Sequence, residues 1–118
     1  MSLLKKLFAG ALFSTSAACS AAPPGPGVVT QVDGAGARAA VAAGATLVDV
    51  RTAGEFSARR VDGAINIPVD QLGRRLAEVP KDKAVVVYCQ SGRRSASAAA
   101  TLAAAGYDAR DLGGIGRW

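Results

Sequence analysis

The feature that most constrains this fold is an apolar run that ends in a cysteine, followed by a polar loop and an alanine-rich segment. Residues 85–95 read VVVYCQSGRRS, and a helix is expected over 95–105. A strand that passes into a helix in this way places Cys89 beside free backbone N–H groups and the positive end of the helix dipole. Both stabilise negative charge. We therefore expect the Cys89 thiol to have a lowered pKa and to act as a nucleophile.

Short apolar runs alternate with helical patterns along residues 28–118. The apolar runs are 46–50, 63–68, 84–88 and 107–112, and the helical patterns are 33–43, a short helix after Thr52, 71–79 and 95–105. Thr52 is a plausible N-cap, and Glu55 completes a capping box. This alternation predicts an α/β fold with a central, mostly parallel sheet and helices on both faces.

Ligand sites in such sheets lie at the carboxyl ends of the strands. Cys89 follows one apolar run, and Asp49 and Arg51 stand at the end of another. We expect Asp49 and Arg51 to pair with each other, or with the loop backbone, and so to support the surroundings of Cys89.

The N-terminal segment resembles an export signal. Lys5 and Lys6 precede the apolar run 7–13, and small residues follow. The run is too short to span a bilayer, which needs about 20 residues. We expect a signal peptide over 1–18, a linker rich in proline, glycine and alanine over 19–27, and one folded domain over 28–118. The alternative for the first segment is a disordered or membrane-grazing tail. A signal peptide would make the protein periplasmic or otherwise exported.

Cys19 follows the small residues 16–18, which resemble a bacterial lipoprotein box except that Ser16 replaces the usual leucine. A lipid on Cys19 would anchor the protein to a membrane. A Cys19–Cys89 disulfide is the alternative, although the two cysteines lie in different contexts and a small disulfide scaffold would need more of them. With Cys19 removed or lipidated, Cys89 would be the one thiol left, and it could not form an internal disulfide.

The charge of the chain argues against a nucleic-acid partner. Without residues 1–18 it carries 12 Lys and Arg against 9 Asp and Glu. The full sequence has six aromatic residues, and no basic stripe is interleaved with them. This balance favours a local preference for small anions. No metal or cofactor is expected. The sequence has no histidine, so the thiolate must be held by backbone amides and the helix N-terminus.

Four motifs together resemble the single-domain rhodanese family. They are LVDVR at 47–51, EF at 55–56 followed by GAINIP at 63–68, the loop at 86–95, and GGI at 113–115 with Trp118. The resemblance runs from about Val28 to the end of the chain. It implies the rhodanese-like three-layer fold, here in an exported form.

The resemblance implies an enzyme of the thiosulfate sulfurtransferase type. Cys89 would take the outer sulfur of a small anionic donor such as thiosulfate, release sulfite, and pass the sulfur of its persulfide to cyanide or a thiol. A persulfide carrier that delivers sulfur to a protein partner would show the same motifs, and this alternative stays open.

Phosphatases and arsenate reductases are the remote alternative on the same fold. They use a longer loop, in which five residues separate the cysteine from an arginine that binds the oxyanion. Here four residues separate Cys89 from Arg94, and Ser95 stands where that arginine belongs. A six-residue loop suits a sulfur atom, whereas a phosphate needs the wider loop.

The residues expected to bind the substrate or the persulfide are Gln90, Ser91, Gly92, Arg93, Arg94 and Ser95. We expect either Arg93 or Arg94 to contact the substrate. Arg59 and Arg60 are expected to face solvent, although the family often has a histidine at the place of Arg60. Trp118 is expected to be a packing residue.

Overall fold

The computed structural model describes residues 27–118. The signal peptide expected over 1–18, Cys19 with its possible lipid, and all but the last residue of the expected linker lie outside these residues. Among residues 27–118, no helix is long and apolar enough to cross a membrane.

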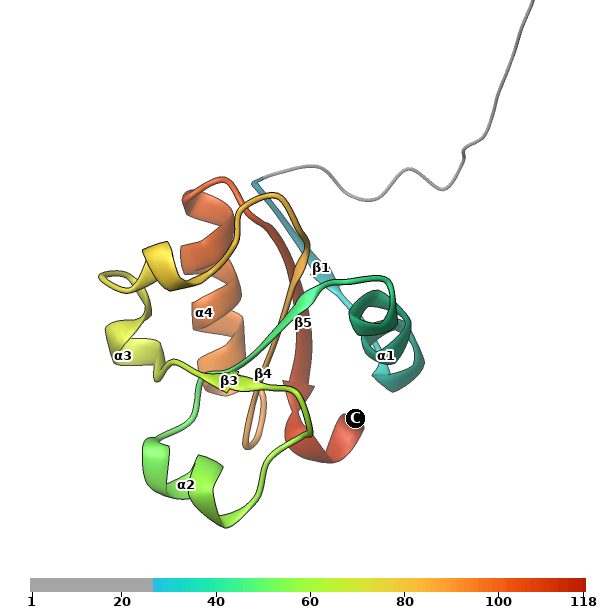
Figure 1. Cartoon of the computed structure of the whole chain (residues 1–118), viewed down its shortest axis with the longest axis vertical. Helices are drawn as coiled ribbons and strands as arrows, with labels where there is room; N and C mark the ends of the chain where they lie inside the picture. Colours follow the sequence, from blue (N-terminus) through green and yellow to red (C-terminus); the bar gives the residue numbers. More distant parts are fainter. Residues whose placement is uncertain (1–26) are drawn as a thin grey trace, which may run out of the picture.

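One five-stranded sheet forms the centre of the described residues, and all of its neighbouring strands run parallel (Figure 1). Its order is β1-β5-β4-β2-β3. The strands are β1 (Val28–Gln31), β2 (Thr46–Asp49), β3 (Ile65–Asn66), β4 (Val85–Cys89) and β5 (Asp108–Gly114). The prediction of an α/β fold with a parallel sheet is confirmed.

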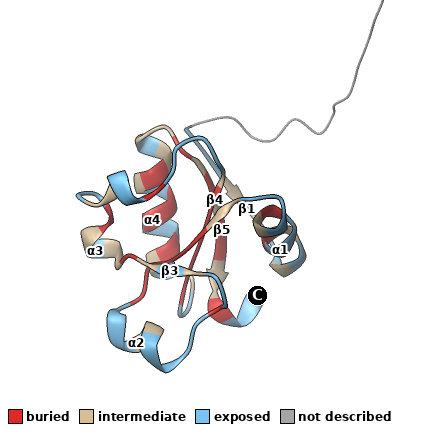
Figure 2. Cartoon of the chain, in the orientation of Figure 1, coloured by how far each residue is buried: buried red, intermediate tan, exposed pale blue. Residues whose placement is uncertain are grey.

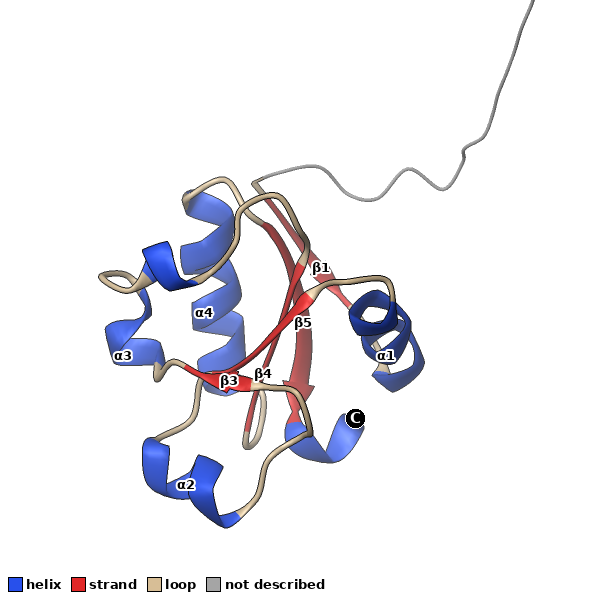
Figure 3. Ribbon diagram, in the orientation of Figure 1, coloured by secondary structure: helices blue, strands red, loops and turns tan. Residues whose placement is uncertain are grey.

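Helices cover both faces of the sheet (Figure 3). The α-helices are α1 (Gly34–Ala42), α2 (Ala53–Ala58), α3 (Val69–Leu72) and α4 (Arg93–Ala104), and the short 3-10 helices are η1 (Leu76–Glu78) and η2 (Ile115–Arg117). α1 lies on one face, and α3 and α4 lie on the other. α2 follows the carboxyl end of β2 and has no buried residue, as its pale colour in Figure 2 shows.

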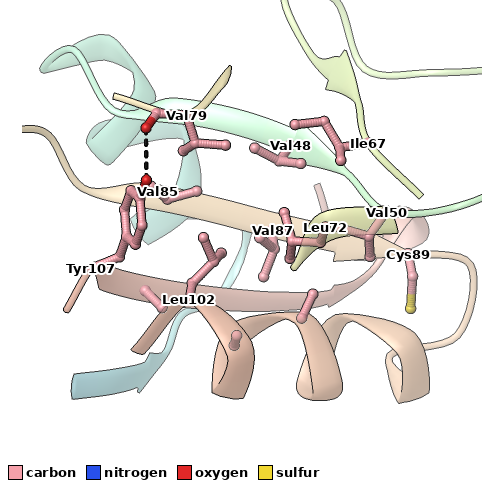
Figure 4. Packing of buried hydrophobic residues seen from close by; sticks show 13 residues of the cluster. Val48, Val50, Ile67, Leu72, Val79, Val85, Val87, Cys89, Leu102 and Tyr107 are labelled. Atoms are coloured by element: carbon pink, nitrogen blue, oxygen red, sulfur yellow. Dashed lines mark hydrogen bonds between the residues drawn. The ribbon is translucent and has the colours of Figure 1, made fainter. Parts of the chain in front are cut away.

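Strand β4 is buried on both faces, which explains its uninterrupted apolar sequence. Val85, Val87 and Cys89 belong to the core cluster beneath α4, and Figure 4 shows the Cys89 sulfur at the end of that cluster. Val86 and Tyr88 belong to the cluster beneath α1. Burial of each valine stabilises the fold by about 1.5–3 kcal/mol, so β4 is held firmly along its length.

The helix predicted over 71–79 is wrong as a continuous element. The structure has α3 and η1 in its place, and Arg75 between them adopts φ −118°, outside the helical range. Gly73 is a poor helix former, which weakens this segment. The Tyr107 hydroxyl lies 2.8 Å from the Val79 carbonyl oxygen (Figure 4). It also lies 3.0 Å from the Leu76 carbonyl oxygen. A tertiary contact therefore replaces continued helical bonding here.

The structure also differs from the sequence prediction in one additional strand and in the bounds of two elements. Strand β1 was not expected; it pairs with β5 at the sheet edge and leaves Val28 and Val29 43% and 40% exposed. β5 extends to Gly114 rather than ending at residue 112. α4 begins at Arg93, two residues before the predicted start.

Candidate active site

Cys89 is the last residue of β4, at the carboxyl edge of the sheet, and its thiol is free and buried. The loop to α4 is short: Gln90 and Ser91 are exposed, and Gly92 is the N-cap of α4. Gly92 has φ 103°, a backbone conformation that a glycine adopts without steric cost. This conformation turns the chain sharply enough for α4 to begin directly above the sulfur.

The loop holds the sulfur with backbone donors. The Gly92 N–H donates to Cys89 Sγ at 2.9 Å. Burial by itself raises the pKa of the Cys89 thiol, but donors from the Ser95 hydroxyl and from the N–H groups of Ser95, Gly92 and Ser91 outweigh it, and the pKa is lowered. Neutral donors therefore favour the thiolate without any histidine.

The early start of α4 corrects the expected make-up of the loop. Arg93, Arg94 and Ser95 form the first turn of the helix rather than a preceding loop. The backbone N–H groups of a first turn have no partner within the helix, so they remain available to an anion. The Ser95 hydroxyl has one proton and two acceptors within reach, the sulfur and the Gly92 carbonyl oxygen at 3.1 Å.

Asp49 and Arg51 form the expected ion pair. Arg51 Nη2 lies 2.7 Å from Asp49 Oδ2, and both side chains are buried, with exposed fractions of 2% and 0%. Arg51 Nε lies 3.1 Å from both carboxylate oxygens, and the Arg51 backbone N–H donates to Asp49 Oδ1 at 2.8 Å. The hydrogen bond that Arg51 donates to Asp49 raises the pKa of Arg51. Several hydrogen bonds therefore hold this buried pair together within the fold.

Arg51 also connects this pair to the loop. Its Nη1 donates to the Gln90 side-chain oxygen at 3.1 Å, and its Nη2 donates to the Arg59 carbonyl oxygen. The contact with the loop is made through the Gln90 side chain, not through the loop backbone. One buried guanidinium therefore links the end of β2, the segment after α2 and the residue that follows Cys89.

The two arginines of the first turn of α4 have different surroundings. Arg94 donates to Glu55 of α2, with Nη1 2.8 Å from Oε1 and Nη2 3.0 Å from Oε2. The Glu55 hydrogen bond raises the pKa of Arg94, and the nearby Cys89 charge contributes in the same direction. Arg93 is exposed and has no ion-pair partner among the described residues. Arg94 is thus occupied by a carboxylate, and Arg93 is available to solvent.

Sequence reasoning placed Glu55 in the EF motif of the family resemblance and gave it one structural role, in the capping box. That box is present: the Thr52 hydroxyl accepts from the Glu55 N–H, and the Glu55 carboxylate accepts from the Thr52 N–H. Its second partner, Arg94, lies 39 residues further along the chain. No local pattern points to such a contact; the one available signal is an acidic residue within a motif otherwise explained by helix capping.

Asn66 and Tyr88 also shape the site, and sequence reasoning gave neither a role. Asn66 Nδ2 donates to the backbone carbonyls of Asp49 at 3.0 Å and Arg51 at 2.9 Å. The buried Tyr88 hydroxyl accepts from the Val61 N–H at 3.1 Å, and burial raises the pKa of Tyr88 to about 12. Tyr88 therefore remains neutral, and Asn66 fixes the backbone on both sides of the turn after β2.

The two glycines at the end of β5 allow the chain to pass close to the loop. β5 carries a bulge at Leu112, because Val87 pairs with Asp111 and Tyr88 pairs with Gly113. A Cβ atom on Gly114 would lie 2.9 Å from the Gln90 carbonyl oxygen. The predicted terminal motif thus has a steric reason: a larger residue at 114 would push the loop.

The remaining residues singled out from the sequence lie around a separate hollow of about 420 Å³. Arg59 and Arg60 are exposed, as expected, and Trp118 packs against the cluster beneath α1, also as expected. The hollow is lined by Arg59, Arg60, Val61, Asp62, Ile115, Gly116 and Trp118. Its apolar residues belong to the cluster beneath α1, so it lies over the face of the sheet opposite the Cys89 side chain.

The arrangement can stabilise a thiolate and a small sulfur anion formed on it. The donors are neutral amides and a hydroxyl at a helix N-terminus, and they point at one buried sulfur atom. Within residues 27–118, no group of three or more histidine, cysteine or acidic residues is placed to hold a metal ion. The chemistry available to these residues is nucleophilic attack by sulfur.

Comparison with known proteins agrees with this geometry. A family model described as a Rhodanese-like domain matches residues 35–118. The chain is 43% identical over 61 residues to a protein named Sulfurtransferase from Allochromatium vinosum, across 52% of this chain and 57% of that relative. It is 40% identical over 62 residues to Thiosulfate sulfurtransferase PspE of Escherichia coli, across 51% of this chain and 60% of the relative. The chain thus matches less than two thirds of the length of these curated relatives.

A solved structure matches over more of the chain. The human single-domain sulfurtransferase TSTD1 is 31% identical, with a TM-score of 0.62, across 75% of this chain and 90% of that one. The match covers most of a single-domain protein, so it supports the whole architecture rather than one motif.

Proposed function

The chain belongs to the family of rhodanese-like domains, and from this premise we propose that it is a sulfurtransferase in which Cys89 carries the transferred sulfur as a persulfide. The observation that carries the proposal is the bonding of the sulfur. Cys89 Sγ accepts from the Gly92 N–H at 2.9 Å, and donors of the helix N-terminus lower the pKa of its thiol. The same donors suit the terminal sulfur of a persulfide anion.

The first half-reaction follows from these donors. The Cys89 thiolate attacks the outer sulfur of thiosulfate, a sulfur–sulfur bond forms to Cys89, and the bond within thiosulfate breaks with its electron pair leaving on sulfite. Three negative charges enter, and three leave as the persulfide anion and sulfite. In the second half-reaction cyanide or a thiolate attacks the terminal sulfur, and the electron pair returns to the Cys89 thiolate. A covalent intermediate of this kind predicts ping-pong kinetics.

The residues around Cys89 have distinct parts in this proposal. The amides of Ser91, Gly92 and Ser95 hold the anion on sulfur. Asp49 and Arg51 act as supporting residues, because Arg51 holds the Gln90 side chain beside the nucleophile. Exposed Arg93 offers positive charge to an approaching anionic donor.

Sulfite release tests the proposal. Purified protein with thiosulfate and cyanide should release sulfite and thiocyanate, and Cys89→Ser should abolish both, since the serine hydroxyl cannot accept sulfane sulfur. Arg60→Gln is the matched control, because Arg60 is exposed and lies over the other face of the sheet. Sulfite release by the Cys89→Ser variant at the wild-type rate would refute the mechanism.

The natural acceptor is tested by the second half-reaction. Protein loaded with thiosulfate and freed of excess donor should carry one additional sulfur atom on Cys89. Rapid loss of that atom to cyanide and small thiols would favour an enzyme with small-molecule acceptors. Slow loss to both, with rapid transfer to a purified protein thiol, would favour the carrier function.

We also propose that the protein is exported, on the basis of residues 1–18 alone. Lys5 and Lys6 before a short apolar run support a signal peptide, and Cys19 after small residues supports a lipid anchor. The intact mass of the protein from its native host tests both. Cleavage after residue 18 with a diacylglycerol mass on Cys19 would support the anchor, and a full-length mass would refute export through this signal.

A further inference from the structure

The arginines nearest the candidate nucleophile are largely neutralised by carboxylates. Arg51 is paired with buried Asp49, and Arg94 is paired with Glu55 through two hydrogen bonds of 2.8 and 3.0 Å. Among residues 27–118, this leaves Arg93 as the arginine of the first turn of α4 without an ion-pair partner. The positive charge that these arginines offer to an approaching anion therefore comes mainly from Arg93.

Glu55 is a fixed part of this charge arrangement. Its Oε1 accepts from the Thr52 N–H and from the Thr52 hydroxyl, each at 3.1 Å, and also from Arg94 Nη1. Its Oε2 accepts from Arg94 Nη2. The bonds from Arg94, and then that from the Thr52 backbone, lower the pKa of Glu55 to about 2. Glu55 is thus ionised at neutral pH, and three groups hold it in place.

The Glu55–Arg94 pair lies at the same helix N-terminus as the donors that bind the sulfur. Arg94 is two residues after Gly92, whose N–H donates to Cys89 Sγ. The Cys89 charge contributes to the raised pKa of Arg94, after the larger contribution of Glu55. A sulfur-donor substrate that approaches Cys89 therefore meets the electric field of Glu55 as well as that of Arg94.

We propose that Glu55 is a specificity-determining residue that offsets the charge of Arg94 and so disfavours dianionic sulfur donors relative to donors with a single negative charge. This inference rests on the proposed sulfurtransferase function. The backbone amides bind the transferred sulfur equally well in a dianionic and in a monoanionic donor. Selection between the two classes of donor therefore depends on the second negative charge, which lies on the leaving group.

Two donors of the same bond type separate these charges. Thiosulfate has two negative charges, and its leaving group is sulfite. Methanethiosulfonate has one, and the Cys89 thiolate would take its terminal sulfur with methanesulfinate leaving on the electron pair of the broken sulfur–sulfur bond. Two negative charges enter that step, and two leave. The ratio of kcat/KM for thiosulfate to that for methanethiosulfonate, measured on the full 118-residue chain, isolates the effect of the second charge.

Glu55→Gln is the variant that removes the charge with least disturbance. Glutamine can replace glutamate in a capping box, so α2 keeps its N-terminal bonds. We expect the ratio to rise about three- to tenfold, the effect of one partly screened unit charge near the donor. The rise should shrink as ionic strength increases, because salt screens exposed charges.

Glu78→Gln is the matched control. Glu78 forms an ion pair with Arg75 on an exposed surface, with Nε 2.7 Å from Oε2, and it is not part of the site. The ratio should be unchanged in this variant. Arg94→Gln provides an independent arm: it leaves the Glu55 charge without its partner, and the ratio should fall instead of rise.

Two results would overturn the inference: an unchanged ratio in Glu55→Gln, or a change in the ratio that is insensitive to salt. An equal loss for both donors would show that Glu55 positions Arg94 or the loop and does not select charge. Failure of the proposed function itself looks different, because then the wild-type protein would release neither sulfite nor methanesulfinate.

Discussion

Two arginine–carboxylate pairs lie near the carboxyl edge of the sheet, one bonded to the loop after β4 and one to the first turn of α4, and their burial differs. Asp49 and Arg51 are 0% and 2% exposed, whereas Glu55 and Arg94 are 33% and 34% exposed. Each pair is joined by more than one hydrogen bond. Removal of one partner of a buried pair leaves a charge in a medium that cannot solvate it, whereas water reaches the partner of an exposed pair.

Two ion pairs with similar bonding can therefore have different roles in the same molecule. The buried pair also bonds the Gln90 side chain and the Arg59 carbonyl, so it ties three segments together. The half-exposed pair joins α2 to the first turn of α4, where its charges are accessible to solvent. We infer that the first pair mainly maintains the architecture and the second mainly sets the charge of the site.

Arg51→Met should have the largest effect on stability. It leaves the Asp49 carboxylate buried without its guanidinium, and we expect a loss of about 3–5 kcal/mol in the free energy of unfolding. Urea denaturation measures this loss. Adding Asp49→Leu should recover part of it, because the uncompensated charge is then gone.

Arg75→Met is the control for Arg51→Met, since Arg75 is the guanidinium of an exposed pair with Glu78. Its effect should be much smaller. If the Arg51 and Arg75 variants lost similar stability, the contrast between buried and exposed pairs would be wrong for this protein.

Asn66→Ala should have the next largest effect, without touching either charge. Asn66 Nδ2 donates to the carbonyls of Asp49 and Arg51, so its loss should cost about 1–3 kcal/mol of unfolding free energy. Asn66→Asp keeps the shape but turns a carboxylate towards two carbonyl oxygens, and it should cost at least as much. Equal stability of Asn66→Ala and the wild type would show that the ion pair alone fixes this turn.

Much of the fold could be predicted because its central elements are specified locally. A strand buried on both faces requires a continuous apolar run, and β2 and β4 have one. Strand β1 lacked such a signal because its two exposed valines are ordered by pairing with β5, a contact between distant parts of the chain. The break between α3 and η1 depends in the same way on Tyr107, which no pattern in residues 71–79 announces.

In the candidate site, too, contacts between residues close in sequence could be predicted and contacts between distant residues could not. Asp49 and Arg51 are two residues apart, and their pairing could be expected from sequence. Glu55 and Arg94 are 39 residues apart, and their contact depends on how α2 lies against the start of α4. Sequence reasoning therefore predicted the loop after Cys89 and the Asp49–Arg51 pair, but it did not predict the contact of Glu55 with Arg94.

Ser95→Ala should have a smaller effect on stability and a clear one on the thiol. Loss of the hydroxyl removes one hydrogen bond, worth about 0.5–1.5 kcal/mol. It also removes a donor that lowers the pKa of Cys89, so that pKa should rise. The ultraviolet absorbance of the thiolate, titrated against a Cys89→Ala reference, measures the change. An unchanged titration would mean that the backbone amides stabilise the thiolate without help from the Ser95 hydroxyl.

Glu55→Gln should have the smallest effect on stability, and its dependence on pH distinguishes the two pairs most sharply. The pKa of Glu55 is lowered from 4.5 to about 2, chiefly by the Arg94 hydrogen bond. A lowered pKa stabilises the folded state above the unfolded value, and that stability is lost as pH falls through the folded value. The wild type should therefore exceed Glu55→Gln slightly in unfolding free energy at neutral pH, and the difference should vanish between pH 4.5 and about 2. Urea denaturation of both proteins across this range measures it. A difference at neutral pH as large as that of Arg51→Met, or one that persists at the lowest pH, would place Glu55 and Arg94 in the architecture beside Asp49 and Arg51.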